Sequence, residues 1–163
     1  MSGIIVHTGP IDTVSVLLEG LRLLVHHGHD SAGIALPRSG RLERWRAPAP
    51  LYALERRLPP SLDARCGIGH TRLATRGEPT ERNAHPHLGG DGRVALVHNG
   101  VVENAEELWR FLRSEGVEPG TDADSEALAH LLAHRIERFG DTLEEAMRAL
   151  LGEARGTLGL AAI

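Results

Sequence analysis

The sequence of 163 residues contains a single cysteine, Cys66, and only 3% aromatic residues. One cysteine excludes an internal disulfide and a thiolate metal cluster, because each needs at least two thiols from the same chain. Cys66 lies in the segment Ala-Arg-Cys-Gly-Ile-Gly, which leads into a long polar motif. We expect this side chain to pack in the interior and to play no catalytic part.

The sequence also lacks a long apolar run and a basic excess. No apolar stretch approaches the ~20 residues of a membrane-spanning helix, and residues 1–6 do not form a secretory signal. The net charge of -4 and the pI of about 6.2 show no excess of basic residues of the kind that binds nucleic acid. With 41% hydrophobic and 25% charged residues, we expect one cytoplasmic globular domain that binds neither a membrane nor nucleic acid.

Hydrophobic periodicity predicts strands first, then helices, then a returning strand. Strands are predicted at residues 2–6, 31–36, 42–45, 93–98 and 157–163, and helices at residues 13–25, 104–116, 125–139 and 143–154. Asp12 or Thr13 is the expected cap of the first helix, and Asn104 with Glu107 and Thr142 with Glu145 are candidate capping boxes. A turn at residues 37–40 separates the second and third strands. This order is typical of a layered α+β domain.

Three polar segments carry most of the functional information. Residues 69–87 read Gly-His-Thr-Arg-Leu-Ala-Thr-Arg-Gly-Glu-Pro-Thr-Glu-Arg-Asn-Ala-His-Pro-His, the chain opens with Met-Ser-Gly-Ile-Ile, and residues 97–100 read Val-His-Asn-Gly. Together they resemble the class II glutamine amidotransferases, most closely the glutaminase half of glucosamine-6-phosphate synthase. The resemblance implies the four-layer αββα sandwich of N-terminal-nucleophile hydrolases over residues 1–163. It also implies release of ammonia from L-glutamine, with no cofactor and no metal.

The family nucleophile is a cysteine directly after the initiator methionine, whereas this chain has Ser2. Once Met1 is removed, the α-amine, with an ordinary pKa of about 7.7 to 8.0, can accept the proton of its own side chain. Gly3 lets a substrate approach closely. Serine is the weaker nucleophile, because a hydroxyl must lose its proton as it attacks. An inactive domain, a slow serine-dependent glutaminase and a domain that binds without turnover all stay open.

The Asn-Gly pair at Asn99 and Gly100 follows a predicted strand. By the resemblance, the asparagine side chain and the glycine backbone amide stabilise the oxyanion of the tetrahedral intermediate. The alternative is that Asn-Gly is an ordinary turn. Because the pair follows the motif of residues 69–87 in the family order, the catalytic interpretation is favoured.

The resemblance also assigns the residues that bind glutamine. Arg72 matches the arginine that holds the α-carboxylate, Thr75 matches a hydroxyl contact, and Asp124 matches the aspartate that receives the α-ammonium. Asp124 is also in position to cap the helix that follows it, and the two roles are compatible. The neighbouring Asp122 stays open as an alternative in the alignment.

Other residues depart from the family pattern. Leu73 stands where the synthase usually has tryptophan, Arg76 where it has histidine, and His27 where it has arginine. Together with Ser2, these changes fall near the expected active site. They favour altered or lost activity over random drift.

Ten histidines raise the question of a metal. His26, His27 and His29 are close in sequence, and His130 and His134 are one helical turn apart. However, no His-Glu-x-x-His pattern occurs, and the family requires no metal. The histidines of the polar motifs, His70, His85, His87 and His98, are explained as parts of motif loops. We therefore predict no metal site.

Family glutaminase domains continue with further strands beyond this length, and the full synthase adds a sugar-isomerising half. We therefore expect a domain that is incomplete at its C-terminus and lacks the isomerase. The expected partner is a sugar-phosphate isomerase domain or subunit that receives ammonia, and a homodimer stays open. A second hypothesis is a non-catalytic glutamine-binding or regulatory module. Only the nucleophile discriminates between the two hypotheses.

Overall fold

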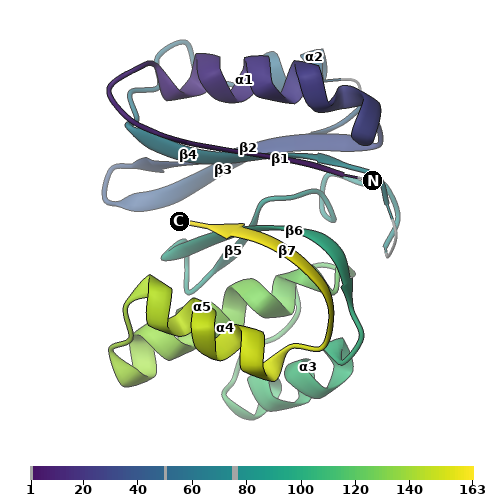
Figure 1. The fold of residues 1–163 in the computed structure, drawn as a ribbon, viewed down its shortest axis with the longest axis vertical. Coiled ribbons are helices and arrows are strands. Elements are labelled where there is room, and N and C mark those ends of the chain that lie inside the picture. The colour runs from purple at the N-terminus through teal and green to yellow at the C-terminus, as the bar shows by residue number, and fades with distance from the viewer. Residues whose placement is uncertain (1, 50, 75–76) are drawn as a thin grey trace.

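Two antiparallel sheets lie face to face between two layers of helices in the computed structural model, which describes residues 2–49, 51–74 and 77–163 (Figure 1). The first sheet has the strand order β1-β4-β2-β3, and the second has the order β5-β6-β7. The strands are β1 (Gly3–Thr8), β2 (Ser31–Arg38), β3 (Arg41–Pro48), β4 (Cys66–Arg72), β5 (His87–Gly89), β6 (Val94–Val102) and β7 (Gly156–Ala162). The helices are α1 (Thr13–Leu24), the 3-10 helix Val25–His27, α2 (Tyr52–Glu55), α3 (Ala105–Ser114), α4 (Ser125–Phe139) and α5 (Leu143–Glu153).

Each sheet buries one face against its own helices and the other against the opposite sheet. Helices α1 and α2 cover the first sheet, and α3, α4 and α5 cover the second (Figure 1). A third apolar cluster, which includes Ala35, Ile68, Ala95 and Val97, fills the space between the sheets. The predicted four-layer αββα sandwich is therefore confirmed.

The first half follows its local sequence signals closely. Asp12 caps α1 by accepting a hydrogen bond from the backbone N–H of Val14, as predicted. The expected turn at residues 37–40 is too long, because β2 and β3 run to a tight turn at Ser39 and Gly40, both with positive φ. Strand β2 tolerates Pro37 because its pairing with β4 ends at Ala35, so this proline has a strand neighbour on one side only.

The second half contains one confirmed cap and one corrected cap. Thr142 and Glu145 form the predicted capping box of α5. The box predicted at Asn104 and Glu107 is wrong, because the side chain of Asn104 makes no cap hydrogen bond. Asn104 instead donates to the carbonyl of Glu153 and accepts from the N–H of Arg155. Its amide therefore ties the start of α3 to the connection between α5 and β7.

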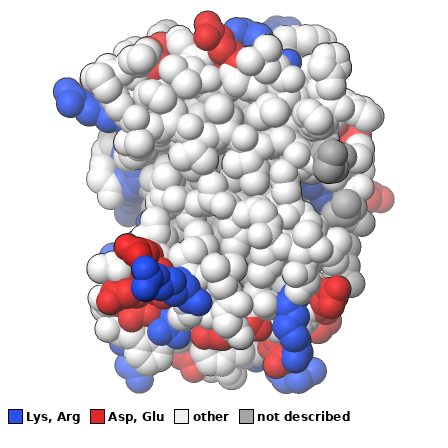
Figure 2. All heavy atoms as spheres, viewed as in Figure 1, with Lys and Arg blue, Asp and Glu red and all other residues white. Residues whose placement is uncertain are grey.

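Charged side chains are sparse along the middle of the face that Figure 2 shows. Figure 2 shows one face on which arginines, aspartates and glutamates gather mainly over the helical layers. Strands β1 and β7, which are edge strands, contain no charged residue apart from the titratable His7. No helix among residues 2–49, 51–74 and 77–163 is long and apolar enough to cross a membrane.

Candidate active site

A cavity of about 430 Å³ opens where the start of β1 meets the ends of β4 and β6. Its lining includes Ser2, Arg72, Leu73, Asn99, Gly100 and Asp124. The first sheet therefore contributes the chain start and the predicted carboxylate-binding arginine, and the second sheet contributes the predicted oxyanion pair. Five of the six predicted site residues meet in this one space. The sixth, Thr75, lies outside the described residues.

Backbone pairing between β1 and β4 fixes the position of Ser2. Gly3 is paired with Thr71, and its N–H donates to the hydroxyl of Thr71 over 3.1 Å. A Cβ on Gly3 would lie 2.7 Å from the Cβ of Leu24, so a larger residue would push the strand off α1. The Oγ of Ser2 accepts a hydrogen bond of 3.0 Å from the N–H of Leu73.

Asn99 and Gly100 lie inside β6, paired with Gly159 and Leu158 of β7. The interpretation of Asn-Gly as an ordinary turn is therefore wrong. Gly100 has a φ of +136°, and a Cβ there would lie 1.8 Å from the carbonyl oxygen of Thr157, so this position requires glycine. The side-chain Nδ2 of Asn99 donates to the backbone carbonyl of Ser2 over 2.7 Å. This bond brings a side-chain donor directly beside the proposed nucleophile.

Arg72 is 4% exposed and forms one wall of the cavity. Its guanidinium donates to the carbonyls of Gly77 and Glu78 over 3.3 and 3.2 Å. Burial lowers the pKa of Arg72 from its ordinary value, and the nearby carboxylates of Asp30 and Asp124 offset part of this effect. The guanidinium is therefore a buried cation held in place from two sides.

Asp124 occupies the N-cap position of α4, but its carboxylate makes no capping hydrogen bond. Its Oδ2 accepts from the backbone N–H of Val102, at the end of β6, over 2.7 Å. The side chain is 8% exposed and lines the cavity. Asp122, the alternative in the alignment, is absent from the described lining and pairs with Asn83 instead. The geometry therefore favours Asp124 over Asp122 as the ammonium ligand.

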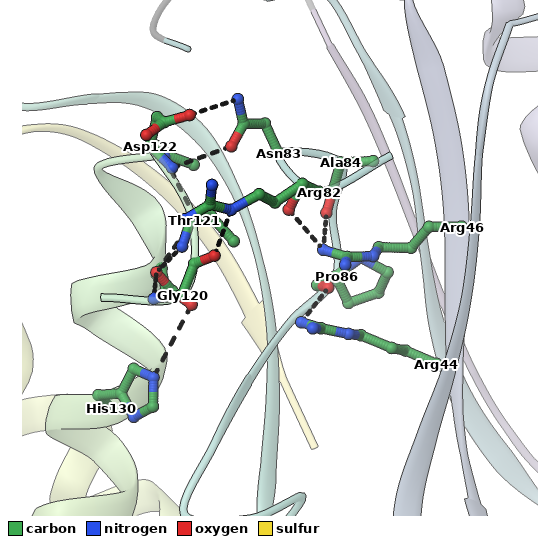
Figure 3. Close-up of polar contacts among 12 residues, drawn as sticks. Arg44, Arg46, Arg82, Asn83, Ala84, Pro86, Gly120, Thr121, Asp122 and His130 are labelled. Carbon is green, nitrogen blue, oxygen red and sulfur yellow. Dashed lines mark hydrogen bonds and ion pairs between the residues drawn. The ribbon is translucent and has the colours of Figure 1, made fainter. Parts of the chain in front are cut away.

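The segment of residues 77–86 is braced against both halves of the molecule (Figure 3). Arg46 of β3 donates to the carbonyls of Arg82 and Ala84 over 3.0 and 2.7 Å. On the other side, Arg82 donates to the carbonyl of Gly120, and Asn83 bonds to the backbone and carboxylate of Asp122. These contacts fix the segment whose carbonyls bind Arg72.

Asp30 is a structural contributor that the sequence interpretation missed. Its Oδ2 accepts from the N–H of Ala74 over 2.7 Å, and its own N–H donates to the carbonyl of Arg72 over 2.9 Å. It thereby holds the chain just after β4, where Leu73 contacts Ser2. The only local signal is its place in the segment His-His-Gly-His-Asp-Ser, where the three histidines are the more conspicuous candidates.

Buried histidines surround the predicted oxyanion residues. His70 lies in β4, His87 in β5 and His98 in β6, so the expectation that these residues belong to motif loops is wrong for all three. The rings of His70 and His85 lie 4.3 Å apart, and those of His85 and His87 lie 4.5 Å apart. Burial lowers the pKa of His70 to about 4 and holds the pKa values of His85 and His87 well below the ordinary range. The rings of His70, His85 and His87 are therefore uncharged at neutral pH.

No group of three or more histidine, cysteine, aspartate or glutamate side chains within residues 2–49, 51–74 and 77–163 is arranged to hold a metal ion. His26, His27 and His29 are exposed. His130 lies 4.0 Å from the carboxylate of Glu126, and His134 contacts aromatic rings. The described lining of the cavity offers hydroxyl, amide, guanidinium, imidazole and carboxylate groups.

Residues 70–161 match the glutamine amidotransferase domain family. The chain belongs to this family. Along its full length it is 42% identical to glutamine–fructose-6-phosphate aminotransferase (isomerizing) of Streptomyces coelicolor, and over 99% of its length it is 45% identical to the enzyme of the same name from Brucella suis. It spans only 27% and 26% of those two proteins.

The solved structures give the same fold. Glutamine phosphoribosylpyrophosphate amidotransferase of B. subtilis matches the whole chain with a TM-score of 0.80 and 25% identity. A structure described as the allosteric regulatory enzyme of purine biosynthesis matches it with a TM-score of 0.82 and 26% identity. The chain covers 35% of each of those chains. The chain is thus similar both to glutamine–fructose-6-phosphate aminotransferases and to enzymes that act in purine biosynthesis or on phosphoribosylpyrophosphate.

Proposed function

We propose that this amidotransferase domain hydrolyses L-glutamine to glutamate and ammonia, with Ser2 as a slow nucleophile. The observation that carries the proposal is the single cavity in which Ser2, the Asn99-Gly100 pair, Arg72 and Asp124 meet. These groups supply a nucleophile, oxyanion donors and opposite charges for an amino acid zwitterion.

In the proposed reaction, removal of Met1 frees the α-amine of Ser2. This amine takes the hydroxyl proton as Oγ attacks the side-chain carbonyl carbon of glutamine. The carbonyl oxygen becomes an oxyanion, which the Nδ2 of Asn99 and the N–H of Gly100 stabilise. The carbon–nitrogen bond then breaks, the amine proton passes to the leaving nitrogen, and ammonia departs. Water hydrolyses the resulting γ-glutamyl ester and releases glutamate.

Glutamine is held by its main-chain charges. The planar guanidinium of Arg72 is suited to a bidentate pair with the α-carboxylate, and Asp124 is suited to the α-ammonium. Thr75 adds a hydroxyl contact in this proposal. Because both charged side chains are almost fully buried, a ligand that brings the two complementary charges would be favoured over one that brings a single charge.

Two further parts of the proposal rest on the relatives, whose name states that they transfer nitrogen from glutamine to fructose 6-phosphate. We propose that the ammonia serves amino-sugar synthesis in the cytoplasm. Its acceptor would be bound by a sugar-phosphate isomerase domain or subunit, because in this proposal the cavity described here binds the amino acid glutamine. The low rate follows from Ser2, since a hydroxyl is a poorer nucleophile than a thiol near neutral pH.

The decisive experiment compares the chain with its Ser2→Cys variant. Intact mass first verifies that Met1 is absent from both proteins. Ser2→Cys should raise glutamine hydrolysis strongly and should make residue 2 react with an electrophilic glutamine analogue. Because Cys66 is the only native thiol, a Cys66→Ala partner variant assigns the label. A trimmed, folded Ser2→Cys protein that neither hydrolyses glutamine nor takes the label would refute the proposal.

Asn99 separates turnover from binding. In the Ser2→Cys background, Asn99→Ala should lower kcat by ~100-fold or more, as for a lost oxyanion donor, and should change glutamine affinity little. Steady-state kinetics and a direct binding titration on the same preparation measure the two effects. Equal losses in both quantities would favour the non-catalytic glutamine-binding module instead.

A further inference from the structure

His70, a buried residue at the wall of the cavity, contacts the side chain of Asn99 through its ring. Its Nε2 lies 2.8 Å from the Oδ1 of Asn99 and 3.2 Å from the backbone carbonyl oxygen of His98. Both partners are oxygens that can only accept, so Nε2 must carry a hydrogen. In a neutral ring, the Nδ1 of His70 then has none. The contacts therefore select a single tautomer of the ring.

The same contact selects one orientation of the Asn99 amide. Its oxygen faces the donating Nε2 of His70, and its nitrogen faces the carbonyl of Ser2 at 2.7 Å. A rotation of the amide by half a turn would set the nitrogen against a donor and the oxygen against the Ser2 carbonyl. Both bonds would be lost at once. The side-chain nitrogen of Asn99 is thus directed to the nucleophile by a histidine on the other sheet.

The surroundings of His70 keep this arrangement rigid. The residue is 1% exposed, lies in β4 and packs against the ring of His85 at 4.3 Å. Its Nδ1 has no hydrogen-bond partner among the described protein atoms. Burial lowers the pKa of His70 to about 4, so the ring stays neutral and keeps its tautomer throughout the physiological range.

We propose that His70 is a positioning residue that orients the amide of Asn99 for oxyanion stabilisation and does not itself touch the substrate's reacting atoms. This inference rests on the proposed glutaminase function, since it assigns to His70 a role in that reaction. Without the donor at Nε2, the Asn99 amide is free to present its oxygen to the developing negative charge. The expected defect is therefore in turnover and not in glutamine affinity.

Two substitutions separate the hydrogen bond from the volume of the ring. The amide nitrogen of glutamine reaches about as far as Nε2 of histidine, whereas that of asparagine reaches only about as far as Nδ1. In the Ser2→Cys background, His70→Asn should lower kcat by roughly 10-fold or more, up to the ~100-fold of a lost oxyanion donor. His70→Gln should recover most of that loss. The dissociation constant for glutamine should change little in either variant.

A double-mutant cycle with Asn99→Ala tests the mechanism directly. If His70 acts through Asn99, His70→Asn should add almost no further loss of kcat once Asn99 is alanine. Equal losses in His70→Asn and His70→Gln, or an undiminished loss of kcat in the Asn99→Ala background, would overturn the proposal. Circular dichroism and urea unfolding check that each variant remains folded.

A second readout does not depend on turnover. Nitrogen-15 NMR of the unmodified chain should show His70 as the neutral ring with hydrogen on Nε2, and the side-chain amide signals of Asn99 should move in His70→Asn. A ring protonated on Nδ1 alone would overturn the positioning role even if the enzyme is active. If the Ser2→Cys protein lacks turnover but these signals are as expected, the proposed function fails while the contact between His70 and Asn99 stands.

Discussion

At the scale of single residues, the cavity is defined by buried groups of opposite charge. Arg72 is 4% exposed and Asp124 is 8% exposed, and each is held by backbone groups of a neighbouring segment. Fixed charges of this kind lose little conformational freedom when a ligand binds. If they bind glutamine as proposed, their placement would favour an amino acid over an uncharged amide.

Removal of either charge should weaken glutamine binding. Arg72→Ala and Asp124→Ala should each cost on the order of 1.5 to 3 kcal/mol, the range for hydrogen bonds to charged groups. Calorimetric titration with glutamine on the unmodified Ser2 background measures the effect without turnover. Asp122→Asn is the matched control, because Asp122 lies on the same loop outside the described lining. A loss of affinity in Asp122→Asn equal to that in Asp124→Ala would reverse the assignment.

At the scale of elements, residues 77–86 connect the two charged anchors. The Nδ2 of Asn83 donates to the carbonyl of Glu78, which also binds Arg72, and its Oδ1 accepts from the N–H of Asp122. Asn83 is 1% exposed. One buried amide thus links the segment beside the carboxylate site to the loop that leads into Asp124.

Truncation of this amide should disturb binding and stability together. Asn83→Ala removes the hydrogen bonds of a buried amide to the carbonyl of Glu78 and to the N–H of Asp122, each of which should cost about 0.5 to 1.5 kcal/mol of unfolding free energy. Glutamine affinity should fall as well, because Arg72 loses the support of Glu78. Urea unfolding and calorimetry measure the two effects. Glu81→Ala, which removes an exposed ion pair with Arg57, should change neither quantity appreciably. Unchanged glutamine affinity in Asn83→Ala would show that the two anchors are independent.

Local patterns predicted the helices well and the buried polar strand poorly. Helix α4 has the predicted bounds of residues 125–139, since its apolar residues recur at helical spacing and Gly140 ends it with a positive φ. Strand β4 was not predicted, because glycines and buried polar side chains such as Thr71 interrupt its apolar alternation. A Cβ on Gly67 or Gly69 would lie within 2.8 Å of side chains from neighbouring elements. Only the assembled core reveals why those glycines are there.

Some features of the site could be predicted from local sequence motifs, whereas others depend on contacts between distant parts of the chain. Arg72, Asn99, Gly100 and Asp124 could be found because they sit in sequence motifs, and their catalytic and binding roles stay predictions. The contact between His70 and Asn99 joins two sheets across 29 positions of sequence. No local pattern reports a contact of that kind, as the failed capping prediction at Asn104 also demonstrates.

At the scale of the whole molecule, the buried histidines should make the fold sensitive to acid. The pKa values of His70, His85 and His87 are lowered in the folded state, to about 4 for His70. Below about pH 6.5 the unfolded chain therefore binds more protons than the folded protein. The free energy of unfolding falls as the pH falls through this range. Each of these histidines lowers it by at most ~1.4 kcal/mol per pH unit. Urea midpoints at about pH 7.5 and about pH 5 measure this loss.

Two variants check the origin of that acid sensitivity. His87→Leu removes one buried ring and should reduce the fall in stability between the two pH values. His29→Ala removes an exposed histidine and should leave the fall unchanged. Stability that does not change with pH in the parent protein would contradict the neutral, buried state of the cluster.

The cationic side chains number 18 and are all arginines, because the sequence contains no lysine. The α-amine is therefore the only primary amine of the chain. An acylating reagent should form one amide, at this amine, and hydroxylamine then removes any esters that formed on hydroxyl groups. If that amine is the proposed base, acylation of the trimmed Ser2→Cys protein should abolish glutamine turnover. Before acylation, kcat should rise with pH through the amine's ordinary pKa of about 7.7 to 8.0. Full turnover by completely acylated protein would exclude the amine as the base.

The bond between Ser2 and Asn99 spans 97 positions of sequence. Ser2 therefore leaves the ribosome long before the proposed oxyanion donors Asn99 and Gly100, and β7, which pairs with the strand that carries them, follows later still. The reactivity proposed for Ser2 would therefore arise only when the second sheet docks on the first, and a chain that lacks the second sheet would lack the proposed oxyanion donors.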